Sequence, residues 1–181
     1  LESEHDSFVL GHTGTSISLA CGLAKTRDMQ HTAAGASEIG NVIAIIGDGS
    51  LSSAIAFEGL NNAAEQGGNL IIVVNDNEMS IAEDFGGMYG NLARLRASNG
   101  TAELNLFKAF GLDYRYVEQG NDVDTLVAAL EDLKDIDHPV VLHIHTTKGL
   151  GFSDETEAQD GSDGCNQTNP QPHAGQCEAN H

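Results

Sequence analysis

Two short apolar segments with a helical segment between them constrain this fold more than any other feature. Residues 41–47 and 69–75 are apolar almost throughout and rich in β-branched side chains, without the alternation of a half-exposed strand. Such runs are typical of strands covered on both faces, as in parallel sheets. Between them, residues 51–66 carry apolar and alanine residues at helical spacing and end before Gly67 and Gly68. The pattern predicts a β–α–β unit with parallel strands.

The neighbouring segments extend this organisation. We predict an earlier helix over residues 15–27, followed by a connecting loop over residues 31–40, which are small, polar and contain glycine. Farther along, a helix, a strand, a helix and a strand are expected at residues 104–110, 113–118, 122–134 and 140–145. The predicted fold class is therefore α/β, a parallel sheet with helices on both faces.

A change of composition divides the chain near residue 152. After Phe152 the sequence turns to Asp, Glu, Gly, Asn, Gln and Pro, with almost no large apolar residue up to its end. We predict one domain over residues 1–152 and a polar linker or tail over residues 153–181. Because the sequence begins at Leu1 without a methionine, inside what reads as a partly formed segment, we expect this domain to be incomplete at its N-terminus.

Charge and cysteine content limit the partners and the compartment. The chain has 8 Lys plus Arg against 27 Asp plus Glu, a net charge of −19. Such a field repels nucleic acids and anionic membranes, and no stretch approaches the roughly 18 apolar residues of a membrane-spanning helix. The cysteines are sparse and odd in number, so we predict no disulfide framework and a cytoplasmic protein. The tail residues Cys165, His173, Cys177 and His181 match no compact zinc motif.

A glycine-rich turn with a carboxylate follows the first apolar strand. In Gly47-Asp48-Gly49-Ser50, the backbone N–H groups and the start of the following helix favour a bound phosphate, which glycine lets approach closely. The carboxylate of Asp48 would suit a Mg²⁺ ion that bridges to the phosphate. A plain strand-to-helix turn is the alternative, because Gly-Asp-Gly is a common sequence.

The second apolar strand ends in a polar segment that strengthens this interpretation. Its sequence is Asn75-Asp76-Asn77-Glu78-Met79-Ser80, and Asn77 follows Asp48 by one β–α–β repeat. Adjacent parallel strands deliver their carboxyl ends to the same sheet edge, where ligands of open α/β sheets bind. Asp48 and Asn77 can therefore converge on one cation, and oxygen ligands suit Mg²⁺.

At these residues the chain resembles the thiamine-diphosphate enzymes, whose cofactor motif runs from Gly-Asp-Gly to an Asn one such repeat later. Further segments resemble the 1-deoxy-D-xylulose-5-phosphate synthase family, in the same order along the chain: residues 11–18, 56–63, 75–81, 107–116, 120–123 and 142–149. The resemblance covers roughly residues 3–152. It implies the diphosphate- and Mg²⁺-binding domain of transketolase type, with the thiamine-diphosphate-binding fold.

The resemblance implies two cofactors, thiamine diphosphate and Mg²⁺. Asp48, the Asn77 side chain and the Met79 backbone carbonyl would hold Mg²⁺. His12 would be a catalytic residue beside the diphosphate and the reacting thiazolium, with a turn histidine that caps the next helix as the alternative. The implied cofactor-binding residues are His12, Thr13, Gly14, Gly47, Asp48, Gly49, Ser50, Asn77 and Phe152.

Two later segments are harder to assign. Residues 148–152 resemble a Lys-Gly-basic-Gly-aromatic loop of the family, but Leu150 replaces the usual cation and Phe152 the usual Tyr. These departures weaken the case for a phosphate contact by this loop. His143 and His145 alternate along a predicted strand and so point the same way, where structural histidines are at least as frequent as ligands. We leave both histidines unassigned.

The implied activity is that of a C–C bond-forming transferase that joins pyruvate to glyceraldehyde 3-phosphate with loss of CO₂, in isoprenoid-precursor and thiamine biosynthesis. It requires a pyrimidine-binding domain in the same enzyme or a separate subunit, and a homodimer. The activating glutamate of that domain cannot be located here, and a family insertion is missing between residues 81 and 104. The alternatives are the N-terminal subunit of a split transketolase-like enzyme acting on sugar phosphates, and a non-catalytic domain with the cofactor fold.

Overall fold

The computed structural model describes residues 5, 7–34, 40–79 and 86–150. The chain divides into two compact units, Leu1–Lys148 and Gly149–His181, and of the second only Gly149 and Leu150 are described. The predicted boundary at residue 152 and the predicted tail therefore lie outside the described residues. Among the described residues, no helix combines the length and apolar character needed to cross a membrane.

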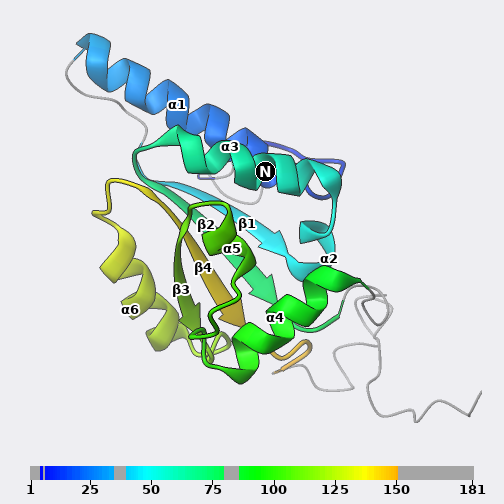
Figure 1. Cartoon of the computed structure of the whole chain (residues 1–181). Coiled ribbons are helices and arrows are strands. Elements are labelled where there is room, and N and C mark those ends of the chain that lie inside the picture. The colour runs from blue at the N-terminus through cyan, green and yellow to red at the C-terminus, as the bar shows by residue number, and fades with distance from the viewer. Residues whose placement is uncertain (1–4, 6, 35–39, 80–85, 151–181) are drawn as a thin grey trace, which may run out of the picture. The chain divides into compact units, whose positions relative to one another are not determined.

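The first unit is a four-stranded parallel sheet between layers of helices (Figure 1). The strand order is β1-β2-β4-β3. In chain order the elements are α1 (Ser16–Ala34), β1 (Val42–Gly47), α2 (Asp48–Leu51), α3 (Ala54–Gln66), β2 (Leu70–Asp76), α4 (Gly87–Ala97), α5 (Leu106–Ala109), β3 (Asp113–Val117), α6 (Val123–Leu133) and β4 (Pro139–His145).

Two hydrophobic cores lie on opposite faces of this sheet. The larger core joins α1, α3, α4 and α5 to one face, through residues such as Ile17, Leu60 and Phe107. The smaller core packs α6 against the other face of β2 and β4, through residues such as Leu133 and Val140. Side chains on successive strand residues point to opposite faces, so one strand serves both cores. The predicted α/β class, with helices on both faces of a parallel sheet, is confirmed.

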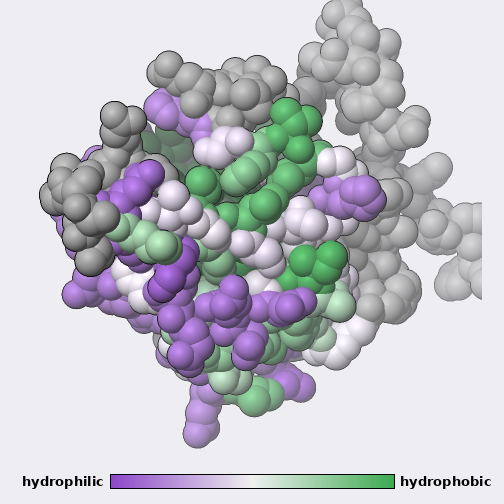
Figure 2. Space-filling view, turned by 90° about the horizontal axis from the view of Figure 1, so that it is seen from above, coloured by the Kyte–Doolittle hydropathy of each residue, from purple (hydrophilic) through white to green (hydrophobic). Residues whose placement is uncertain are grey.

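The first strand differs from its predicted environment. β1 is an edge strand, and Ile43 and Ile45 are 47% and 67% exposed, whereas β2 and β4 are buried almost throughout. The prediction that the first apolar run is covered on both faces is therefore wrong, because α6 packs against β2 and β4 and not against β1. Figure 2, the view from above, shows hydrophobic side chains gathered in one strip, bordered by hydrophilic ones.

Three helical segments also differ from prediction. The predicted loop over residues 31–40 is wrong for its first part, because α1 continues to Ala34 through residues 28–34, which contain neither glycine nor proline. The predicted single helix over residues 51–66 is two helices, because the Ser53 hydroxyl caps α3 by accepting a hydrogen bond from the Ala56 N–H. Helix α4 was not predicted.

The sheet register places three strand ends side by side. Gly47 at the end of β1 pairs with Asn75 of β2, and Asp76 of β2 pairs with His145 of β4. The Thr146 hydroxyl donates to the Asn75 side-chain oxygen at 2.7 Å, which ties the segment after β4 to β2. The carboxyl edge of β1, β2 and β4 is therefore a continuous row of polar residues.

Candidate active site at the carboxyl edge of the sheet

Asp48 and Asn77 lie in direct contact at the ends of β1 and β2. The Asn77 N–H donates to Asp48 Oδ2 at 3.3 Å, and the Gly49 N–H donates to Asp48 Oδ1 at 2.9 Å. Asp48 is only 2% exposed. A buried carboxylate is costly unless hydrogen bonds or a cation balance its charge. The fold thus brings together the two strand-end residues that were predicted as metal ligands.

The turn after β2 connects Asn77 to Met79, the third predicted ligand. Asn77 Oδ1 accepts a hydrogen bond from the Met79 N–H at 3.2 Å, and it keeps a second lone pair for another partner. A carboxylate, an amide oxygen and a backbone carbonyl are hard oxygen donors, so this set fits Mg²⁺. In the described part of the chain, no three His, Cys, Asp or Glu side chains cluster as a metal site of another kind.

The predicted cofactor residues near the N-terminus line a small cavity beside the end of β1. The cavity has a volume of about 150 Å³, and His12, Thr13, Gly14, Gly47 and Ser50 contribute to its wall. The imidazole of His12 is exposed and has no hydrogen-bond partner within the described residues. The His12 carbonyl accepts from the Thr15 hydroxyl at 3.2 Å. The His12 backbone thus stabilises the turn before α1, while its imidazole remains exposed at the cavity.

Phe152 lies outside the described residues, so its predicted cofactor contact has no structural counterpart. Gly49 lies in the single turn of α2, where its N–H is engaged by Asp48. The predicted cofactor residues therefore fall into two neighbouring groups, one around the cavity and one around the Asp48–Asn77 contact. Gly47 and Ser50 belong to the first group and flank Asp48 in the chain.

Gly14 is required by its backbone conformation and by the space around it. Its φ is +83°, and an added Cβ would lie 2.1 Å from the Ser53 hydroxyl that caps α3. We expect Gly14→Ala to lower the free energy of unfolding by about 1–3 kcal/mol, from left-handed strain and a disturbed cap. Urea denaturation measures this loss. In Gly11→Ala the new Cβ meets nothing within 4 Å, so an equal loss in that variant would contradict the explanation.

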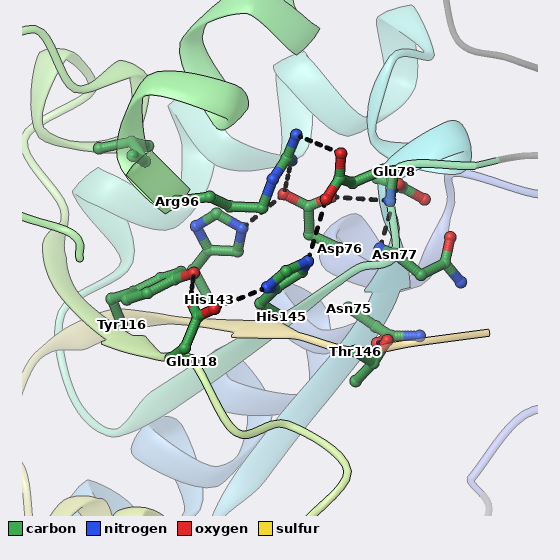
Figure 3. A network of polar contacts seen from close by, with 12 residues as sticks. Asn75, Asp76, Asn77, Glu78, Arg96, Tyr116, Glu118, His143, His145 and Thr146 are labelled. Atoms are coloured by element: carbon green, nitrogen blue, oxygen red, sulfur yellow. Dashed lines mark hydrogen bonds and ion pairs between the residues drawn. The ribbon is translucent and has the colours of Figure 1, made fainter. Parts of the chain in front are cut away.

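A buried ion pair and a buried histidine lie next to Asn77 (Figure 3). Asp76 Oδ2 accepts from Arg96 Nη1 at 2.5 Å and from His143 Nε2 at 2.8 Å. Burial by itself raises the pKa of Asp76, but the hydrogen bonds and positive charge of these partners outweigh it and lower the pKa to about 2. On its other side, His143 Nδ1 lies 2.8 Å from the Tyr114 hydroxyl. Asp76 is thus an anion held from two sides.

A more exposed set of polar contacts, around His145, lies next to the ion pair of Asp76 and Arg96. His145 lies 3.1 Å from a Glu78 carboxylate oxygen and 3.3 Å from one of Glu118, and the Tyr116 hydroxyl also donates to Glu118. Figure 3 shows these side chains converging from β2, β3 and β4. Sequence reasoning left His143 and His145 unassigned and did not connect them to Asp76. No short sequence pattern carries this signal, because Asp76 comes opposite His145 only through the pairing of β2 with β4, which are distant in the sequence.

Comparisons with known proteins agree with this geometry. The family model described as 1-deoxy-D-xylulose-5-phosphate synthase matches residues 1–105 and 98–146. The 1-deoxy-D-xylulose-5-phosphate synthase of Stutzerimonas stutzeri is 34% identical over 185 residues, covering 84% of this chain and 28% of the relative. That of Alcanivorax borkumensis is 34% identical over 203 residues, covering 94% of this chain and 30% of the relative. The chain thus spans less than a third of these relatives.

The same comparisons show that the relatives carry residues that have no counterpart in this chain. Both alignments are longer than the 181-residue chain, of which each covers only a part, so the relatives carry residues without a counterpart here. The two matched segments of the family model meet at residues 98–105, directly after α4. The two segments meet within the region where we predict the family insertion to be missing, and its absence stays a prediction.

A solved structure shows the same fold. Transketolase from Campylobacter jejuni superposes with a TM-score of 0.57 at 23% identity, covering 77% of this chain and 21% of the transketolase. At this identity the likeness concerns the fold. The family match covers most of the chain, and the synthases align over more than four fifths of it. The chain therefore belongs to the 1-deoxy-D-xylulose-5-phosphate synthase family.

Proposed function

We propose that this chain is the part of a 1-deoxy-D-xylulose-5-phosphate synthase that binds the diphosphate of thiamine diphosphate through Mg²⁺. The observation that carries the proposal is the hydrogen bond of 3.3 Å from the Asn77 backbone N–H to Asp48 Oδ2, which joins the ends of neighbouring parallel strands. Ligands of open α/β sheets bind at such strand ends. Family membership supports a cofactor-binding role for this contact, because the family model matches residues 1–105, which include both positions.

Each predicted residue has a role in this proposal. Asp48, the Asn77 side chain and the Met79 carbonyl hold Mg²⁺, whose charge lets a diphosphate approach a protein of net charge −19. The diphosphate itself lies along the cavity lined by Thr13, Gly14, Gly47 and Ser50, next to Gly49.

His12 contributes an exposed imidazole at the same cavity. There its ring nitrogens could donate or accept a hydrogen bond with the bound cofactor or substrate. Thiamine diphosphate, when bound, supplies the carbanion chemistry, while the chain binds and orients it. The cofactor contact of Phe152 stays a prediction, because this residue lies outside the described residues.

The proposed reaction joins two small substrates. Pyruvate loses CO₂, and its remaining two-carbon unit forms a C–C bond with the aldehyde of glyceraldehyde 3-phosphate. We further propose that the pyrimidine end of the cofactor is bound by the remaining part of the enzyme or by a separate subunit, in a cytoplasmic homodimer. The proposal of a remaining part is supported by the share of the relatives that the chain spans, 28% and 30%.

Reconstitution tests this proposal. The chain is mixed with the separately expressed pyrimidine-binding part of a related synthase, and thiamine diphosphate and Mg²⁺ are titrated in a calorimeter. We expect cofactor binding that requires Mg²⁺, and CO₂ release from pyruvate that requires glyceraldehyde 3-phosphate. Turnover of sugar phosphates without pyruvate would instead identify a split transketolase-like subunit. No cofactor binding in the presence of the partner would identify a non-catalytic domain.

A further inference from the structure

We propose that Arg96 is a positioning residue for the Mg²⁺ site, which holds Asn77 in place by clamping the residues on both sides of it. This inference rests on the proposed function and concerns a residue that touches neither metal nor cofactor. Arg96 lies in the last turn of α4, on an element that contributes none of the predicted ligands.

The clamp consists of two charge-assisted contacts from one guanidinium. Arg96 Nη1 lies 2.5 Å from Asp76 Oδ2, and Nη2 lies 3.2 Å from Glu78 Oε2. Figure 3 shows the guanidinium between these carboxylates, with Asn77 on the chain that joins them. The planar fork of arginine orients both partners, which a point charge does less well. The Asn77 backbone can therefore move away from the proposed Mg²⁺ site only if one of the two ion pairs opens.

His143 anchors the same carboxylate from inside the sheet. A carboxylate only accepts hydrogen bonds, so His143 Nε2 donates to Asp76, and in neutral His143 the Nδ1 atom accepts from the Tyr114 hydroxyl. His143 is fully buried. Asp76 is thus fixed by the rigid β4 on one side and by Arg96 on the other. Its second oxygen, Oδ1, accepts from the Glu78 N–H at 3.1 Å, which bridges Asn77.

The backbone at Glu78 is strained in a way that needs such support. Its φ is +65°, in the left-handed region that a glutamate rarely adopts. A residue keeps such a backbone conformation only when several contacts with its surroundings hold it there. Here the Glu78 N–H bonds to Asp76, and the Glu78 side chain contacts both Arg96 and His145. Arg96 therefore makes two of the contacts that maintain the turn carrying Asn77 and Met79, one with Asp76 and one with Glu78.

The connection between α4 and α5 holds the end of α4, where Arg96 lies. The Gly100 N–H donates to the Leu95 carbonyl at 2.7 Å and closes the helix directly after Arg96. The Asn91 side chain bonds to the Leu104 carbonyl at 2.8 Å and accepts from the Leu106 N–H at 3.0 Å. These contacts bind α4 to the start of α5 across the segment that joins them. The short connection thus holds the clamp over the strand end.

Three variants of the 181-residue chain test the clamp. Arg96→Leu removes both ion pairs, Arg96→Lys keeps one charge that cannot span both carboxylates, and Arg94→Leu removes an exposed arginine of the same helix as the matched control. Amide hydrogen exchange reports positioning without any metal. We expect the Glu78 amide to exchange about tenfold faster in Arg96→Leu, because its acceptor Asp76 is then less well held. The Asn77 amide should follow, because the turn that carries its N–H toward Asp48 loosens with Asp76 and Glu78. The control should exchange like the unmodified chain.

Mg²⁺ affinity, measured in the presence of thiamine diphosphate and the pyrimidine-binding partner, gives the second readout. Loss of a residue that orients a metal ligand weakens binding by about 10-fold to 100-fold, and we expect Arg96→Leu to fall in this range, with Arg96→Lys in between. Thermal melting verifies that each variant is folded. Exchange rates and Mg²⁺ dissociation constants within twofold of the unmodified chain, in a folded Arg96→Leu, would overturn the inference. Absence of Mg²⁺ binding in the unmodified chain would instead refute the proposed function, while the exchange data still decide whether Arg96 holds Asn77.

Discussion

Asp48→Ala abolishes Mg²⁺-dependent binding of thiamine diphosphate if the proposed site is correct. The variant removes the only carboxylate of the proposed ligand set and the acceptor of the Asn77 N–H. Without the cation, a diphosphate would face a protein of net charge −19. Loss of a direct ligand should exceed the roughly 10-fold to 100-fold loss that follows from disturbing a residue behind it. Calorimetric titration of the reconstituted protein measures the effect.

Two controls separate the metal site from general charge effects. Asp132→Ala removes an exposed carboxylate of α6, and we expect it to leave the affinity unchanged. Titration of the unmodified protein with excess chelator should reproduce the defect of Asp48→Ala. If Asp48→Ala bound thiamine diphosphate and Mg²⁺ as tightly as the unmodified protein, the carboxyl edge of β1 and β2 would not be the diphosphate site.

Phe107→Ala should cause the largest loss of stability among single substitutions near the site. Phe107 is fully buried at the start of α5, and its ring stacks on Tyr114 with a centroid distance of 5.6 Å. Removing such a buried ring costs about 3–5 kcal/mol, from lost burial and the cavity left behind. This is a large part of the total stability of an ordinary domain, about 5–15 kcal/mol. Denaturant unfolding followed by circular dichroism measures the change.

The effect of Phe107→Ala should also reach the polar network. The Phe107 ring lies 6.2 Å from the His143 ring, so it supports the histidine that anchors Asp76. Phe110→Ala is the matched control, because Phe110 is only half-buried and contacts Phe57 edge-on at 6.2 Å. We expect a smaller loss there. Equal losses in the two variants would show that the packing around Phe107 has no special role.

Much of the site could be predicted because its parts are local in sequence. The β-branched runs before Asp48 and Asn77 mark two strands, and one intervening helix makes them parallel neighbours. Parallel strands of one sheet end at the same edge, which places the residues after both strands on one side of the sheet. The positions of Gly14 and His12 beside that edge could not be derived in this way. They came from the resemblance to a family, because the packing of a loop against a distant strand leaves no periodic pattern.

The sequence by itself determined the parallel sheet, the placement of Asp48 and Asn77 at strand ends and the family, because strand patterns and motif words are encoded by neighbouring residues. Only the tertiary structure decided that β1 is an edge strand with Ile45 exposed, since strand order depends on which segments pack together. It also brought Arg96, twenty positions along the chain, onto Asp76. That contact depends on where α4 ends and how it packs. Such non-local packing is the part of the site that no short pattern encodes.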